Sequence, residues 1–199
     1  SVDHKSQPIP QDTKILFSIL PSIDRGAIGA AVGVENVAEK TGELIYDLCK
    51  GWAVPNLAAR ARGIPTGLIT HGTVNGALTE CAQALVSRDH EFSAGTLFAA
   101  ETSAVFVGHI HGHNTWALNG RRIAYPGSIT RLIYGHMADT GYLMWDVKAD
   151  RADFQFIITP AKKLIQIDFP GVPDMEELKK VAASAAGAHI RVRWSVDSE

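Results

Sequence analysis

Short apolar runs alternate along this sequence with longer segments in which apolar residues recur at helical spacing. An apolar run of about four to eight residues, bounded by glycine, proline or polar residues, is typical of a buried strand. Apolar residues three or four positions apart indicate one face of a helix. The fold that these elements imply is α/β. We expect strands at 14–20, 64–71, 104–107, 115–118, 121–124, 142–147, 154–159, 163–168 and 189–194, and helices at 36–63, 93–100 and 174–186.

Capping residues and one proline set the expected helix ends. Asn36 can cap the start of the first helix, and Gly63 can end it. Pro55 lies inside this helix and should kink or split it, because proline lacks the N–H group and clashes with the preceding turn. Ser93 and Asp174 are the expected N-caps of the other two helices.

The remaining segments predict loops and turns. Residues 22–35 are rich in glycine and alanine, and we expect a loop there. Residues 73–89 predict another loop, with a short helix around 78–85. Asn119-Gly120 favours the type I′ turn that closes a hairpin. Pro160 marks a boundary between two parts of the chain.

Composition excludes several classes of protein. The 199 residues are 46% hydrophobic and 20% charged, which is ordinary for a globular chain with a sizeable core. A net charge of −2 gives no global attraction to nucleic acid, so binding to DNA would need a local patch. Cys49 and Cys81 make no disulfide framework and fit a reducing compartment. No run reaches the roughly 18 apolar residues of a membrane helix, and no signal peptide is recognisable.

Three histidines follow two of the expected strands. His109 and His111 come after the run at 104–107, and His71 ends the run at 64–71. In an extended chain residues i and i+2 point the same way, so His109 and His111 can face one spot. The about 38 residues from His71 to His109 suffice for a strand–helix–strand crossover, which needs roughly 30. Parallel strands joined in this way end on the same edge of the sheet.

Imidazole nitrogen is a common ligand of transition metals, so His71, His109 and His111 form a candidate metal site. The alternative for His109 and His111 is a pair of surface histidines in a polar turn. The alternative for His71 alone is a core histidine with its hydrogen bonds satisfied. Spacing by itself leaves these alternatives open.

Two motifs around these histidines are similar to those of a known family. Thr70-His71-Gly72 followed by Gly108-His109-Ile110-His111 resembles the last two metal motifs of the calcineurin-like metallophosphoesterases. More narrowly, the chain resembles the nuclease subunit of the SbcCD double-strand-break repair complex and its phage and archaeal relatives. The resemblance covers roughly residues 14 to 168. Further matching segments are Asp89-His90-Glu91-Phe92, the stretch 120–128 with Tyr125-Pro126-Gly127-Ser128, Arg131-Leu132 and 141–147.

The resemblance implies a fold, an activity and partners. The fold would be a metallophosphoesterase-type mixed β-sandwich flanked by helices, with its C-terminal part at 1–159 and a small β-α-β capping piece beginning at 160–199. The activity would be that of an exonuclease and endonuclease of DNA repair and recombination with two divalent metal ions, manganese or alternatively magnesium. His71 and His109 would bind one ion and His111 the other. The partners would be DNA, an SMC-like ATPase subunit of the SbcC type and a second copy, in a cytoplasmic, nucleoid-associated setting.

The first three motifs of the family are absent. No Asp is followed two residues later by His, no Gly precedes Asp and no Asn precedes His, so D-x-H, G-D-x-x-D and G-N-H do not occur. We therefore expect a fragment that lacks the metal-binding carboxylates, binds manganese weakly and cleaves DNA little or not at all. A partial sheet leaves an unpaired edge, which we expect the missing N-terminal half or self-association to cover.

Further residues are candidates for supporting the ligands or for contacting DNA. Exposed arginines of the hairpin, Arg121 and Arg122, can contact phosphates or merely keep that face soluble. Asp89-His90 can act as an acid/base pair or form a capped turn. The residues considered as supporting groups or DNA contacts are His113, Asn114, Tyr125, Ser128 and Arg131.

Two other functions are compatible with the sequence. One is a small-molecule metallophosphodiesterase, against which the segments shared with the nuclease branch argue. The other is a non-catalytic module that binds DNA or the ATPase, which the absence of the first three motifs favours.

Overall fold

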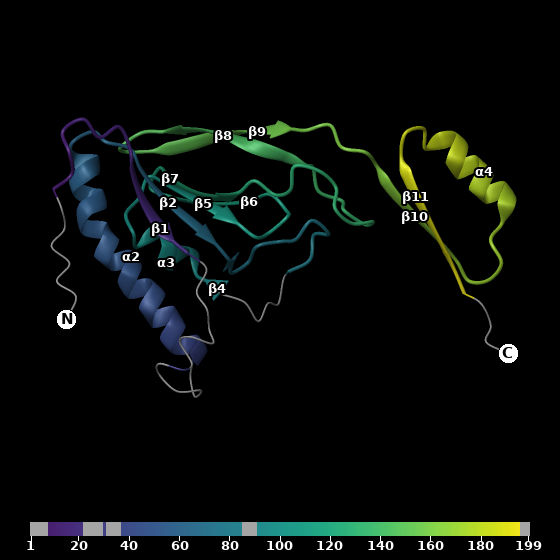
Figure 1. Cartoon of the computed structure of the whole chain (residues 1–199), viewed down its shortest axis with the longest axis horizontal. Helices are drawn as coiled ribbons and strands as arrows, with labels where there is room; N and C mark the ends of the chain where they lie inside the picture. The colour runs from purple at the N-terminus through teal and green to yellow at the C-terminus, as the bar shows by residue number, and fades with distance from the viewer. Residues whose placement is uncertain (1–7, 22–29, 31–36, 85–90, 196–199) are drawn as a thin grey trace.

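The computed structural model of the chain describes residues 8–21, 30, 37–84 and 91–195. A five-stranded sheet lies at its centre, with two helices on one face and a β-hairpin across the other (Figure 1). A second, smaller unit of two strands and one helix follows at the C-terminal end. The described part of the chain is thus a mixed α/β structure, as the sequence predicts.

The central sheet brings the ends of its parallel strands to one edge. Its order is β1-β2-β5-β7-β6, in which the first four strands are parallel and β6 runs antiparallel to β7. His71, the last residue of β2, pairs in register with Gly108, the last residue of β5. The predicted crossover between these two strands is confirmed. The strands are β1 (Leu16–Leu20), β2 (Thr66–His71), β5 (Ala104–Gly108), β6 (Asn114–Leu118) and β7 (Arg121–Tyr125).

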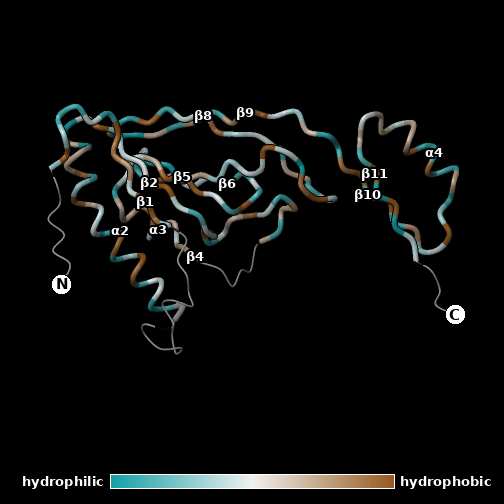
Figure 2. The backbone as a smooth tube through the Cα atoms, in the orientation of Figure 1, coloured by the Kyte–Doolittle hydropathy of each residue, from teal (hydrophilic) through white to brown (hydrophobic). Residues whose placement is uncertain are grey.

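The main core lies between the sheet and the helices α2 (Val37–Ala61) and α3 (Ala94–Phe98). Alternate residues of the strands point to these helices, since the pleat directs successive side chains to opposite faces. In Figure 2 hydrophobic and hydrophilic stretches alternate along α2 and the strands, as this packing requires. Burying one such side chain contributes about 1.5–3 kcal/mol. The largest buried apolar side chains of the core are Ile45, Leu68, Leu97, Val105, Ile123 and Tyr125.

The opposite face of the sheet is only partly covered. The hairpin of β8 (Gly141–Val147) and β9 (Ala152–Ile158) places Trp145 against Phe106, with ring centroids 4.9 Å apart. Over β1, however, the side chains of Phe17 and Ile19 remain 44% and 62% exposed. Apolar surface at the edge of the sheet therefore lies open in this structure.

Helix α2 continues through its proline. It spans 25 residues with Pro55 inside, so of the two expected outcomes, a kink or a split, the split is wrong. The next residue, Asn56, is fully buried and donates hydrogen bonds to Ser18 Oγ (3.1 Å) and to the carbonyl of Ala100 (2.8 Å). These contacts hold the second half of the helix on the sheet. The expected cap Asn36 and most of the expected loop 22–35 lie outside the described residues.

The short helix expected around 78–85 is wrong for the residues that the structure describes. Residues 78–84 form turns closed by an isolated bridge between Leu78 and Ala84. Thr79 Oγ1 accepts hydrogen bonds from the backbone N–H groups of Cys81 and Gln83, which competes with helix formation. Ala82 has a φ of +56°, a left-handed conformation that ends a helix.

Most other predicted elements are confirmed. Ser93 caps α3 by accepting the N–H of Thr96, and Asn119-Gly120 has the positive φ angles of a type I′ turn. The strands β3 (Thr73–Val74) and β4 (Glu91–Phe92), which pair in parallel, were not predicted. Each has only two residues, which is too short to show an alternating pattern.

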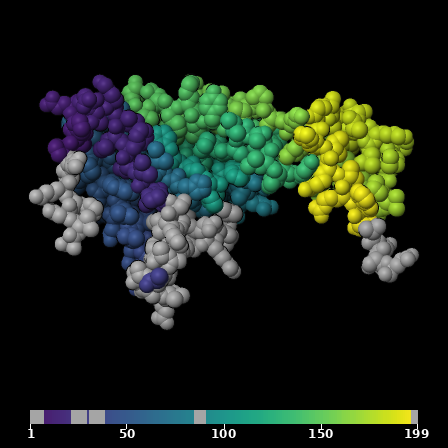
Figure 3. All heavy atoms as spheres, in the orientation of Figure 1, coloured from purple at the N-terminus to yellow at the C-terminus, as the bar shows by residue number. Residues whose placement is uncertain are grey.

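The C-terminal unit forms the predicted β-α-β arrangement. Strands β10 (Leu164–Phe169) and β11 (His189–Trp194) are parallel, and α4 (Met175–Ser184) is capped by Asp174. Figures 1 and 3 show this unit beyond the end of the hairpin. The guanidinium of Arg191 lies over the ring of Tyr134, 4.2 Å from its centroid, and joins the two parts. Among the described residues no helix has the length and apolarity needed to cross a membrane.

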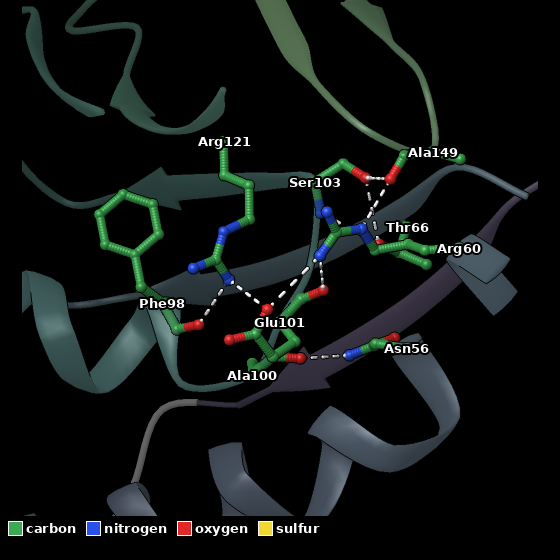
Figure 4. Close-up of polar contacts among 9 residues, drawn as sticks. All are labelled: Asn56, Arg60, Thr66, Phe98, Ala100, Glu101, Ser103, Arg121 and Ala149. Atoms are coloured by element: carbon green, nitrogen blue, oxygen red, sulfur yellow. Dashed lines mark hydrogen bonds and ion pairs between the residues drawn. The ribbon is translucent and has the colours of Figure 1, made fainter. Parts of the chain in front are cut away.

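A polar network holds the amino ends of the strands (Figure 4). Arg121 is 6% exposed and donates to the carbonyl of Phe98 (2.9 Å) and to Glu101 Oε2 (2.8 Å). Arg60 donates to the carbonyl of Ala149 (2.6 Å) and to Glu101, so two arginines share one carboxylate. Arg121 is therefore a buried structural residue, and the alternative that it contacts phosphate at the surface is wrong. Arg122, by contrast, lies at the surface, 3.6 Å from Asp153.

Candidate functional site

Two of the three predicted ligands meet at the carboxyl edge of the sheet. The rings of His71 and His109 are in edge-to-face contact, with centroids 5.2 Å apart. His71 ends β2 and His109 directly follows β5, so the pairing of these parallel strands brings the two residues close. A Cβ atom on Gly108 would lie 2.9 Å from Nδ1 of His71. Glycine at 108 therefore leaves the space that the His71 ring occupies.

His109 has a strained backbone. Its φ is +110°, a region that side chains other than glycine rarely adopt. Such a conformation costs on the order of 1–3 kcal/mol and persists only where the surrounding structure imposes it. Strand β5 ends at Gly108, just before this residue. The chain is therefore not extended from 109 to 111, and the expectation that His109 and His111 face one spot as i and i+2 of a strand is wrong.

His111 lies beside a carboxylate that the sequence analysis missed. Its Nδ1 is 4.0 Å from Glu80 Oε2, in the loop that follows β3. The His111 side chain is 47% exposed and that of Glu80 is 15% exposed. Ile110, between the two histidines of the motif, is buried and anchors the turn. Nothing in the local sequence around Glu80 signals this contact, because it depends on long-range packing.

A tight turn after β7 supports the backbone of His111. Ser128 donates its N–H to the carbonyl of His111 at 3.0 Å. Gly127 has a φ of +79°, and a Cβ atom there would lie 2.9 Å from the same carbonyl oxygen. Glycine is thus required for the close approach, and the Tyr-Pro-Gly-Ser segment acts as a support beneath the His111 loop.

Tyr125 fixes the loop that follows His71. It is fully buried, and its hydroxyl donates to the carbonyl of Gly72 (2.5 Å) and accepts the N–H of Val74 (2.8 Å). Burial raises the pKa of the Tyr125 hydroxyl well above its usual value, so it stays protonated. A buried side chain cannot touch DNA, and of the two roles considered for Tyr125 only the supporting one is compatible with this position.

His113 and Asn114 are also engaged in internal contacts. The His113 ring stacks on Phe156 with centroids 4.9 Å apart, and its Nδ1 is 2.7 Å from the carbonyl of Tyr125. The Asn114 amide donates to the carbonyl of Leu78 and accepts the N–H of the same residue, both at 2.8 Å. These two side chains tie the edge of the sheet to the hairpin and to the 78–84 loop.

The loop after the Tyr-Pro-Gly-Ser turn contributes a buried histidine. His136 is 7% exposed, and neither ring nitrogen has a hydrogen-bond partner in the described part of the chain. Desolvation lowers the pKa of His136, with the charge of Glu80 opposing this shift, so the ring is neutral near pH 7. Sequence reasoning did not select His136, because a lone histidine in a loop carries no pattern.

The remaining candidate residues are Arg131, Ser128 and the pair Asp89-His90. Arg131 donates to the carbonyl of Ala161 at 3.1 Å, next to the start of the C-terminal unit. The Ser128 hydroxyl is buried and has no hydrogen-bond partner among the described residues. The pair Asp89-His90 lies outside the described residues.

An apolar cleft of about 650 Å³ opens beside the histidine edge. It runs between the sheet and the β8–β9 hairpin, with Ile69, Phe106 and Trp145 on its walls and His71 at its border. The cleft is continuous with the exposed apolar surface of β1, since Ile19 also lines it. The histidines thus stand at the end of a hydrophobic surface.

The donor set fits metal binding in part. Within the described ranges, no three side chains of His, Cys, Asp or Glu lie close enough together to hold a metal ion. The His71–His109 pair supplies nitrogen donors, which suit zinc, nickel or copper, whereas manganese and magnesium prefer oxygen. The assignment of His71, His109 and His111 as ligands therefore stays a prediction. No protein-family model matches the chain, and no curated protein matches it.

Proposed function

We propose that this chain supplies the nitrogen-donor half of a two-metal phosphodiesterase centre of the SbcD-type nuclease class. His71 and His109 hold one ion and His111 holds the other. The carboxylate donors come from polypeptide outside these 199 residues, since the sequence contains none of the D-x-H, G-D-x-x-D and G-N-H motifs. The substrate is DNA, and the proposed partner is an SMC-like ATPase. The family resemblance of the motifs is the source of the substrate and the partner.

One observation carries this proposal: the contact of His71 with His109 at the ends of adjacent parallel strands. Open α/β sheets place their ligands at this edge. The strained backbone of His109 adds support, because strain of this kind clusters at active sites. The glycine at 108, which leaves space for the His71 ring, fits the same role.

The chain's own residues supply positioning rather than proton transfer. Bound metal ions of a bimetal site activate a water molecule and stabilise the leaving oxygen of a phosphodiester. The pairing of β2 with β5 brings His71 and His109 close, while Tyr125 holds the backbone directly after His71. The Tyr-Pro-Gly-Ser turn holds the backbone of His111. Manganese binds weakly to such a nitrogen-only set, so the isolated chain has little or no nuclease activity.

Calorimetric titration with nickel tests the proposal on the chain alone. We expect wild type to bind nickel, and His71→Ala and His109→Ala each to weaken binding at least about tenfold, because each removes one of two adjacent imidazole rings. His189→Ala, an exposed histidine of β11, is the matched control and should leave affinity unchanged. Equal nickel affinity in wild type and in both site variants would contradict the proposal.

A nuclease assay tests the second part of the proposal. The pure chain with manganese and linear duplex DNA should show no cleavage above background. Measurable exonuclease activity that His111→Ala abolishes would show that this chain needs no external carboxylates, and would overturn that part.

A non-catalytic binding module is the second candidate function. The absence of a three-donor group in the described part of the chain favours it. Such a module would bind DNA or the ATPase with the same affinity in wild type and in His71→Ala, whereas the two-metal proposal ties tight DNA binding to an intact metal site.

A further inference from the structure

We propose that Glu80 is a positioning residue for His111: its carboxylate selects the imidazole tautomer in which Nδ1 carries the proton and Nε2 is free to bind a ligand. The geometric part of this inference stands on the structure alone. Its consequence for metal binding rests on the proposed function.

The contact is selective. Oε2 of Glu80 lies 4.0 Å from Nδ1 of His111, and no other cationic or imidazole nitrogen of the described residues lies within this distance of the Glu80 carboxylate. The separation exceeds that of a direct hydrogen bond and suits charge attraction or one bridging water. The Glu80 side chain is 15% exposed and that of His111 is 47% exposed, so solvent screens this interaction in part.

The fold fixes both partners. The carbonyl of Glu80 accepts the N–H groups of Met137 (3.0 Å) and Ala138 (3.2 Å), which ties its loop to the segment after the Tyr-Pro-Gly-Ser turn. The backbone of His111 is held by Ser128. Between them, Gly112 packs so closely on the backbone of Leu78 and Thr79 that a Cβ atom would collide with both carbonyl oxygens. Backbone contacts thus bring the two loops together, and the carboxylate and the imidazole meet where the loops adjoin.

A carboxylate near one ring nitrogen determines what the other nitrogen does. A negative charge on the Nδ1 side of the ring favours the proton at Nδ1, which leaves the lone pair on Nε2 available as a ligand. A burial cost accompanies this arrangement, because an acidic group at 15% exposure is partly desolvated. His136, the other imidazole near Glu80, is buried and neutral and offers no compensating charge.

Long-range ¹H–¹⁵N NMR spectra of the metal-free chain at pH 8 test the tautomer directly. We expect His111 to be protonated mainly at Nδ1 in wild type, and mainly at Nε2 in Glu80→Gln. Glu80→Asp, which keeps the charge, should restore part of the Nδ1 form. Asp146→Asn, which removes an exposed carboxylate paired with Lys148, is the control and should leave the His111 signals unchanged. The same tautomer in wild type and in Glu80→Gln would overturn the inference.

Nickel titration of the wild-type chain separates this inference from the proposed function. The proposed nickel donors are His71 and His109, so Glu80→Gln should bind nickel like wild type and keep its thermal midpoint. If wild type binds nickel but the His111 tautomer is the same in wild type and in Glu80→Gln, the positioning role is wrong while the proposed function stands. If wild type binds no nickel but the tautomer changes in Glu80→Gln, the proposed function fails while the positioning role stands.

Discussion

The backbone of His109 makes a prediction at the scale of a single residue. Because its φ of +110° is unfavourable for any residue with a Cβ atom, His109→Gly should be more stable than His109→Ala by about 1 kcal/mol. Both variants remove the imidazole, so their difference reports the backbone alone. Urea unfolding followed by circular dichroism measures it.

A control at an ordinary strand position should give the opposite order. At His189 in β11, glycine should be less stable than alanine by about 0.5–1 kcal/mol, because glycine loses more conformational freedom on folding. If glycine is also the less stable residue at 109, the backbone there is not strained.

Individual site residues were predictable only where a pattern marked them. His71 and His109 follow apolar runs and motifs, and the structure brings their rings together. Glu80 and His136 carry no such mark, because their positions near His111 arise from loops that meet through long-range backbone hydrogen bonds. The i, i+2 rule failed for His111 because the strand ends one residue before His109.

At the scale of elements, two neighbouring arginines of β7 provide a matched pair. Arg121 is buried and joins β7 to α3 through Phe98 and Glu101, whereas Arg122 is paired with Asp153 at the surface. Arg121→Ala should lower the free energy of unfolding by about 3 kcal/mol, since it breaks buried hydrogen bonds and an ion pair.

Arg122→Ala should lower the same free energy by less than about 1 kcal/mol, as is usual for exposed ion pairs. Chemical unfolding of the two variants and of wild type measures both losses of free energy. Repeating it at high salt shows how much of each loss comes from charge attraction that salt screens. A loss of similar size in the two variants would show that the network of Figure 4 contributes little to stability.

The elements themselves were largely predictable, and the failures have physical causes. Short β-branched and aromatic runs identified the five strands of the sheet, because those residues must fill one buried face. The helix around 78–85 failed because Thr79 and Ala82 favour turns, and the split at Pro55 failed because Asn56 is held by the sheet. Tertiary contacts overrode local preference in both cases.

For the whole molecule, the open apolar surface at β1 predicts association. Phe17 and Ile19 are 44% and 62% exposed on an edge strand, and exposed edges of this kind pair with other chains. We expect the weight-average mass to rise with concentration in sedimentation equilibrium at micromolar concentrations. Ile19→Lys should reduce this association, because a charged residue at an edge opposes pairing.

Val172→Lys is the control for that experiment. Val172 is 93% exposed in the C-terminal unit, far from β1 in the sequence, and its replacement should leave association unchanged. A monomer of constant mass over the whole concentration range would contradict the prediction and would mean that this apolar surface stays exposed to solvent without causing association.

The polar network among Arg60, Glu101 and Arg121 has one more consequence. It gathers the amino ends of the strands, two helices and the hairpin turn at Ala149 into one set of hydrogen bonds. At the opposite edge the Tyr125 hydroxyl holds the loop that follows β2 through Gly72 and Val74. Arg121 and Tyr125 are the first and last residues of β7, so one five-residue strand anchors both edges of the sheet. A shift of β7 along its axis would therefore disturb the arginine network and the histidine edge together.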